Sequence, residues 1–305
     1  TVTGQNVEIA DGATLDASGT EGGGTILIGA DDKGALIIDS LLGTLDNAET
    51  TTIAAGASID ASSTDGDGGH VVVWGDNAVN FHGLIDTMGG DNGFVEVSTH
   101  GTGVIDGAAR TGSLLIDPQD VCIQSSASTC ATSPLLVTPA VLSSSTIASV
   151  LSDGGDVTIT TKATDVDGNG TADGGTLGGT GRVLFANTNI KVDNNSGTMG
   201  TLSIYAADWI DTGETGFQSI GTTGTNYEFY AGSSAGTTGT AESSAYIKLY
   251  DQIFETGGGH VIFDAADDVY IRDPLKTSGG DVTLIARGGD AGSNLIFGGG
   301  ADGYI

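Results

Sequence analysis

The chain repeats itself, and this repetition restricts its possible folds more than any other feature. The segment GATLDAS at 12–18 returns as GASIDAS at 56–62. Each copy is followed by glycines and an apolar strand, GGTILIG at 23–29 and GGHVVVWG at 68–75. Related glycine-led apolar segments follow at 92–98, 154–160, 200–206, 258–265 and 279–286. Recurrence of one short motif along a whole chain is the sequence signature of repeat architectures.

The spacing of the repeats gives the size of the unit. Gly24 and Gly69 lie 45 residues apart, whereas Gly259 and Gly280 lie 21 residues apart. We interpret the underlying unit as about 20–24 residues, sometimes doubled, which falls within the range of solenoid repeats.

The aligned strands share a period-two pattern. Two positions are apolar in every copy, and the residues beside them vary in chemistry. The apolar pairs are Ile26 and Ile28, Val71 and Val73, Val95 and Val97, Val157 and Ile159, Leu202 and Ile204, Val261 and Phe263, Val282 and Leu284. Alternation of this kind places the apolar pair inward and the variable residues outward. One such strand buries too little surface to fold alone, so stacked units must share a continuous core.

We therefore predict an all-β fold, a right-handed parallel β-helix with lateral loops and one short helix. Residues 1–117 are expected to form N-terminal coils, and 152–305 are expected to form C-terminal coils continuous with them. Residues 118–151 are expected to be an insertion with a cysteine loop. Apolar residues at helical spacing within 137–153 predict the short helix.

Composition narrows the classes of function. The net charge is −30, from 39 acidic and 9 basic residues, so the chain repels nucleic acid and anionic membranes. No apolar run approaches the roughly 18 residues of a membrane span. Cys122 and Cys130 lie in a Ser/Thr-rich stretch, where a small loop closes readily as a disulfide in an oxidising compartment. We predict the disulfide, with two free thiols as the alternative.

The motifs resemble those of the filamentous-haemagglutinin-like exoproteins of bacterial two-partner secretion systems. The resemblance is carried by IDAS followed by GG-x-V-x-V and by four longer segments. These segments are GLIDTMGGDNGFVEVSTHG at 83–101, GSLLIDPQDVCI at 112–123, TIASVLSDGGDVTITT at 146–161 and PLKTSGGDVTLIA at 274–286. The family's Asn-Pro-rich secretion motif is not visible, so we expect this piece to lie downstream of it, in the rod.

The resemblance implies a long β-helical rod that mediates adhesion, aggregation or biofilm cohesion. We accordingly expect an extracellular location, at the bacterial cell surface or in its matrix. The expected partners are a host or neighbouring-cell glycan or protein, or copies of the chain in a filament, with no nucleic acid and no membrane insertion.

The segment DVDGNGTADGG at 165–175 resembles part of a calcium loop. Asp165, Asp167 and Asn169 alternate, Thr171 offers its carbonyl at the seventh position, and Asp173 stands at the ninth. Calcium needs several oxygen ligands that converge on one point, which alternating carboxylates around a glycine turn provide. The twelfth position is Thr176 rather than Glu, so a calcium half-site and a polar surface turn both stay open.

The alternative to an adhesive rod is a glycan-active β-helix enzyme. Lyase chemistry would require a basic cleft, and hydrolysis would require two carboxylates about 5–10 Å apart. The arginines, Arg110, Arg182, Arg272 and Arg287, are widely spread along the sequence. We therefore predict that the chain is not an enzyme. Candidate binding aromatics are Trp74, Trp209 and the cluster Tyr227, Phe229 and Tyr230.

Overall fold

The chain folds as the predicted right-handed parallel β-helix, with parallel strands stacked into long sheets. The fold is seen in a computed structural model. It describes residues 1–90, 93–125, 130, 136, 139–161, 181–186, 188–192, 197–212, 217–221, 224–232, 245–249, 254–272, 274–287 and 294–297. In this part of the chain, no helix has the length and apolar composition of a membrane span.

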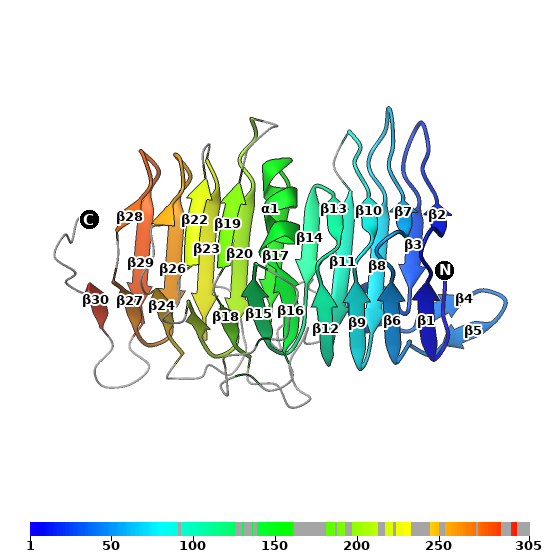
Figure 1. The fold of residues 1–305 in the computed structure, drawn as a ribbon, viewed down its shortest axis with the longest axis horizontal. Coiled ribbons are helices and arrows are strands. Elements are labelled where there is room, and N and C mark those ends of the chain that lie inside the picture. The colour runs from blue at the N-terminus through cyan, green and yellow to red at the C-terminus, as the bar shows by residue number, and fades with distance from the viewer. Residues whose placement is uncertain are drawn as a thin grey trace.

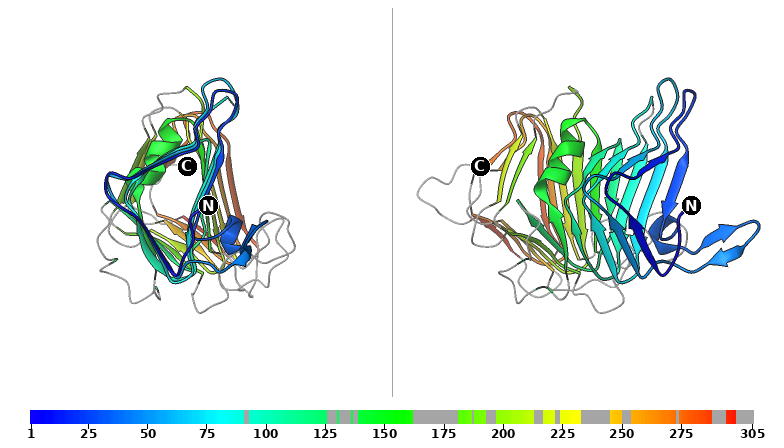
Figure 2. Two further views of the ribbon diagram at one scale, coloured as in Figure 1. Left: turned by 90° about the vertical axis from the view of Figure 1, so that its right-hand side faces the viewer. Right: turned by 45° about the vertical axis from the view of Figure 1, so that its right-hand side comes forward.

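Each coil crosses three faces in the same order. The chain first runs along the longest sheet, called sheet B. It then crosses the third face, runs along the sheet that carries the repeated apolar motifs, called sheet A, and returns to sheet B. Seen down the axis, the coils outline a triangle, and from the side the strands follow one another along the rod in near-sequential order (Figure 1, Figure 2). Since parallel neighbours are hydrogen-bonded, each coil advances the rod by about 4.8 Å.

Sheet A carries the repeated apolar motifs on nine strands in the described residues. Along the axis these are β3 (Thr25–Ile28), β8 (His70–Gly75), β11 (Phe94–Thr99), β14 (Ser113–Ile116), β17 (Asp156–Thr160), β20 (Thr201–Ala206), β23 (Asn226–Ala231), β26 (Val261–Ala265) and β29 (Val282–Ala286). Thr25 pairs directly with His70. The 45-residue spacing is therefore one coil with an insertion, and the interpretation as a doubled unit was wrong for this pair.

Sheet B is the longest sheet, with eleven strands in the described residues. Along the axis these are β1 (Asn6–Ile9), β6 (Thr50–Ile53), β9 (Ala78–Phe81), β12 (Thr102–Ile105), β16 (Ala140–Ser143), β15 (Val121–Gln124), β18 (Val183–Phe185), β21 (Ile210–Asp211), β24 (Ile247–Leu249), β27 (Val269–Ile271) and β30 (Leu295–Phe297).

The third face consists of two short sheets separated by a helix. Sheet C contains β2 (Thr14–Asp16), β7 (Ser58–Asp60), β10 (Leu84–Asp86) and β13 (Ala108–Arg110). Sheet D contains β19 (Thr188–Val192), β22 (Phe217–Gly221), β25 (Phe254–Glu255) and β28 (Leu275–Lys276). The helix α1 (Ser144–Ser152) packs against β13 on one side and β19 on the other, so it takes the place of a strand.

The helix confirms the prediction of one short helix. The Ser143 side chain accepts a hydrogen bond from the Ser145 N–H and caps the amino end. Ile147, Val150 and Leu151 are buried in the main core. Gly154, with φ of +82°, follows the carboxyl end, because a residue without Cβ adopts this left-handed conformation readily.

The segment 118–151, expected to be an insertion, contributes two strands to sheet B. β15 pairs with β18 on one side and with β16 on the other, and β16 pairs with β12. The chain thus forms β15 one strand position away from β12. It then returns and places β16 in the position between β12 and β15.

The predicted inward positions form the core from β3 to β26. Val71, Val73, Val95 and Val97 are fully buried, as are their equivalents in the later strands. In β29, at the end of sheet A in the described residues, Val282 is 44% exposed. The alternation predicted from the sequence is therefore confirmed wherever a strand has coils on both sides.

A glycine precedes most strands of sheet A, and neighbouring coils approach closely at these positions. A Cβ on Gly69 would lie 2.3 Å from the Gly24 carbonyl oxygen, and a Cβ on Gly93 would lie 2.3 Å from that of Gly69. Real Cβ atoms do not come this close to backbone, so any larger residue would push the coils apart. The GG-x-V-x-V motif therefore reflects stacking as well as turn formation.

The motif Leu/Ile-Asp-Ala-Ser ends strands β2 and β7 of sheet C. Asp16 Oδ1 accepts hydrogen bonds from the N–H and hydroxyl of Ser18, at 2.9 and 2.7 Å. Asp60 and Ser62 repeat this arrangement one coil later. The bonds from Ser18 lower the pKa of Asp16. An aspartate that accepts from the residue two positions ahead stabilises a tight turn, which explains why the motif recurs.

A lateral hairpin leaves the rod between β3 and β6. Its strands β4 (Ile37–Asp39) and β5 (Gly43–Leu45) pair antiparallel and project beyond the N-terminal coils in Figure 1. Its tip is apolar and exposed: Ile38 is 81% and Leu41 is 91% exposed.

Candidate functional site

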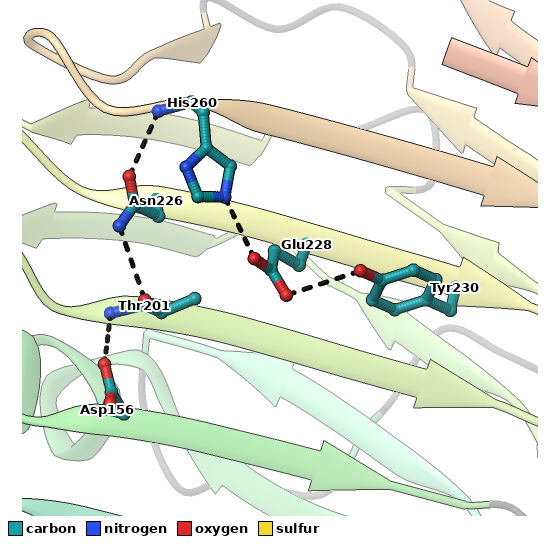
Figure 3. Close-up of polar contacts among 6 residues, drawn as sticks. All are labelled: Asp156, Thr201, Asn226, Glu228, Tyr230 and His260. Atoms are coloured by element: carbon teal, nitrogen blue, oxygen red, sulfur yellow. Dashed lines mark hydrogen bonds and ion pairs between the residues drawn. The ribbon is translucent and has the colours of Figure 1, made fainter. Parts of the chain in front are cut away.

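The candidate site is the outward face of sheet A between β17 and β29. Successive side chains of a strand point to opposite faces, so every second residue here points away from the core. We call this surface the polar face. It includes Asp156, Thr201, Tyr205, Asn226, Glu228, Tyr230, His260, Asp264 and Arg287, and the apolar Ile262 and Ile285 also point outward on it. Six of these residues are drawn in Figure 3.

A chain of hydrogen bonds runs along the rod axis at the start of these strands (Figure 3). Asp156 Oδ1 accepts the Thr201 N–H at 2.8 Å. The Asn226 amide donates to Thr201 Oγ1 at 3.4 Å and accepts the His260 N–H at 3.1 Å. Each bond joins one coil to the next, so the orientation of the Asn226 amide is fixed.

Glu228 lies at the centre of the polar face. Its Oε1 lies 2.9 Å from His260 Nε2, and its Oε2 accepts the Tyr230 hydroxyl at 3.3 Å. Tyr205, one coil earlier, stacks on Tyr230 with ring centroids 4.9 Å apart and planes 5° from parallel. Burial, and next the Glu228 carboxylate, raise the pKa of both tyrosines, so their hydroxyl groups stay protonated.

Asp264 and Arg287 form an ion pair at the edge of this face. Arg287 Nε donates to Asp264 Oδ1 at 2.6 Å, and Nη2 donates to Oδ2. The Asp264 side chain is buried, and its hydrogen bond raises the pKa of Arg287. The bidentate geometry fixes both side chains, which is the strong form of such a pair.

This arrangement is suited to noncovalent binding. It presents hydroxyl, amide and carboxylate groups next to two aromatic rings, all held by bonds to neighbouring coils. Glu228 and Asp264 both bond to protein groups, which fixes their side chains on this face.

The arginines whose contacts are described are spread over the rod. Arg110, Arg182 and Arg287 lie on or beside strands of sheets C, B and A respectively, so they do not converge on a basic cleft. Arg110 pairs with Asp86, and Arg182 pairs with Asp208, each at 2.7 Å.

A shallow hollow at the N-terminal end is lined by Thr3, Gly4, Gln5, Leu45, Asp46, Asn47 and Glu49.

The predicted calcium ligands Asp165, Asp167, Asn169, Thr171 and Asp173 lie outside the described residues, so that site stays a prediction. Among the described residues, no group of three or more histidine, cysteine or carboxylate side chains is placed to hold a metal ion.

The predicted disulfide between Cys122 and Cys130 is present, with Cα atoms 6.2 Å apart. Cys122 lies on the outward side of β15 and is fully buried. It packs in a small second core with Leu184 and Trp209. The bridge thus ties the loop after β15 to the outer surface of sheet B.

The aromatic residues predicted from the sequence as binding candidates differ in location and burial. Tyr227 and Phe229 are in the core, and Trp209 is buried in the second core. Trp74 points outward, but the insertion after β3 covers it and leaves it 1% exposed. Tyr230 remains as the half-buried member on the polar face.

Glu96 is a buried carboxylate that sequence reasoning missed. It occupies an outward position of β11, where alternation predicts exposure, yet it is fully buried. The turn η1 (Asp32–Gly34) lies over it, and the Lys33 N–H donates to both carboxylate oxygens at 3.2 and 3.1 Å. Gly34 lies against the Trp74 ring, where a Cβ would come within 2.3 Å of a ring carbon.

Sequence reasoning also missed Tyr205, Glu228 and Asp264 as partners on one face. Aligning the repeats would have placed Tyr205 and Tyr230 at equivalent outward positions, which the register confirms. The sequence contains no comparable signal for Glu96.

The chain matches no protein-family model, and no curated protein matches its sequence at a significant level.

Proposed function

We propose that this chain is part of an extracellular structural and adhesive rod at a bacterial cell surface or in its matrix. The observation that carries the proposal is the polar face, an ordered outward surface on a continuous β-helix. A fold whose core is filled by stacked side chains has no interior site to offer, so its binding chemistry must lie on the outer faces.

Further features support an extracellular role. Disulfides persist in oxidising compartments, and the Cys122–Cys130 bridge fits such a location. The charge of −30 favours solubility over association with nucleic acid or anionic lipid. The resemblance of the sequence motifs to those of the filamentous-haemagglutinin-like exoproteins supports the same role. Calcium binding at 165–173 and end-to-end association into filaments remain predictions within this proposal.

Attachment to cells tests the proposal. Polystyrene beads coated with the folded chain are applied to cultured epithelial monolayers and to bacterial biofilms, and the retained beads are counted after washing. Beads coated with reduced and denatured chain are the control. We expect the folded coat to retain more beads on at least one surface. Equal retention by the two coats on both surfaces would refute an adhesive role.

A further inference from the structure

Two adjacent coils present related side chains on the polar face. Tyr205 and Tyr230 occupy equivalent positions on adjacent strands, as do Thr201 and Asn226. Their spacing along the rod is therefore that of neighbouring strands, about 4.8 Å. A polymer whose own units recur at a similar interval can make the same kind of contact on both coils, and the hexose units of an extended polysaccharide are of comparable length.

The chemical groups on this face match those of a sugar. Tyrosine combines an apolar ring, which packs against the C–H groups of a sugar, with a hydroxyl that forms hydrogen bonds. Carboxylate and amide groups such as Glu228 and Asn226 bond sugar hydroxyls, because one accepts and the other both donates and accepts.

The charge of the face restricts the type of polymer. Asp156 and Glu228 contribute carboxylates, whereas Asp264 is buried and forms an ion pair with Arg287. The whole chain carries −30. Uronic or sulfated polysaccharides would be repelled by this surface, whereas neutral ones would not.

The face is also ordered before any ligand binds. The Glu228 side chain is held by His260 and Tyr230, and Asn226 is held between Thr201 and His260. Side chains that are already fixed lose little conformational entropy on binding, so even a shallow surface can bind usefully.

From the tyrosine stack, the fixed amide and carboxylate groups, and the negative charge, we infer that the polar face binds a neutral, extended polysaccharide. The polysaccharide lies along the rod axis, with successive sugar units over β20 and β23. This inference rests on the proposed adhesive function and names the chemical class of its ligand.

Affinity electrophoresis tests the inference with named polymers. The folded chain is run through native gels that contain hydroxyethyl cellulose, laminarin or dextran as neutral probes, and alginate as the anionic probe. We expect slower migration with at least one neutral polymer and none with alginate. Retardation by alginate as strong as by the neutral polymers, or no retardation by any neutral polymer, would overturn the inference.

Variants locate the site. The double variant Tyr205→Ala/Tyr230→Ala should weaken the apparent affinity at least about tenfold. Tyr270→Ala is the matched control, since Tyr270 is a half-buried tyrosine on the outward side of sheet B, and it should bind normally. Circular dichroism checks folding, and Glu228→Gln gives a second test if the double variant is unstable. Unchanged binding by a folded double variant would refute this location.

The electrophoresis and the bead assay test the polysaccharide inference and the adhesive function separately. Beads that attach to cells while no neutral polymer retards the chain would leave the adhesive function standing and refute the polysaccharide. Failure of both assays would refute both.

Discussion

The buried Glu96 carboxylate should make the stability of this rod depend on pH near neutrality. Glu96 lies under the turn that begins the lateral hairpin, and its pKa is raised to about 7. Burial is the main cause, and the neighbouring Asp32 adds to it. Hydrogen bonds from the Lys33 N–H and the Ser98 side chain act in the opposite direction but do not compensate for the loss of water.

The size of the effect follows from the two pKa values. A group whose pKa is higher in the folded protein stabilises it fully below its unfolded pKa, and this stabilisation is lost as the pH rises through the folded pKa. For Glu96 these values are 4.5 and about 7. Since one pKa unit corresponds to about 1.4 kcal/mol, the folded state should lose about 3 kcal/mol across this interval.

Urea unfolding of Glu96→Gln measures this loss. Trp74 lies beside the turn, and Trp209→Phe leaves it as the single tryptophan of the chain, so its fluorescence reports on the docked hairpin. We expect the free energy of unfolding of the parent to fall by about 3 kcal/mol from pH 4.5 to about pH 8 relative to that of Glu96→Gln. The glutamine variant should therefore be the more stable protein at the alkaline end.

The comparison separates the effect of Glu96 from that of the ionisable side chains near it. His70, which lies 2.8 Å from Asp32, and His100, whose pKa is lowered by burial, are present in both proteins. Glu8→Gln, at an exposed position of β1, is the matched control and should leave the pH profile unchanged. Parallel profiles for the parent and Glu96→Gln would refute the assignment of a raised pKa to this group.

Three further predictions concern stacking, the disulfide and the core. Gly200→Ala should lower stability by about 1–3 kcal/mol, because its Cβ would lie 2.3 Å from a carbonyl oxygen of the preceding coil. Gly22→Ala should be near neutral, because the nearest atom to its Cβ would be 3.9 Å away. Thermal melts of both variants and the parent measure the difference. Replacing Cys122 and Cys130 by alanine should cost about 2.5 kcal/mol in urea unfolding, and an effect equal to that of reductant on the parent would support the bridge. Phe229→Ala should cost about 3–5 kcal/mol, because its ring packs between two other phenylalanine rings at 5.9 and 5.2 Å; a loss below 1 kcal/mol would show that the core collapses around the gap.

The sequence by itself determined the architecture and the inner face of each strand. Period-two alternation defines which side chains enter the core, and a one-residue shift would expose all of them, so Val71 and Val73 could be placed inside with no structure. The repeated glycines and IDAS turns recur because each coil meets its neighbours in the same way. The pairing of Cys122 with Cys130 followed from their short separation.

The tertiary structure alone decided what happens on the outer faces. Trp74, Glu96 and Glu228 all occupy outward positions of their strands. An insertion from another part of the chain covers Trp74 and Glu96, whereas Glu228 stays partly exposed. The reversed order of β15 and β16 is likewise absent from the local pattern, because both strands have the same alternation and fit either level. An outward side chain takes its environment from residues that are distant in sequence, whereas an inward one meets the same apolar core in every coil.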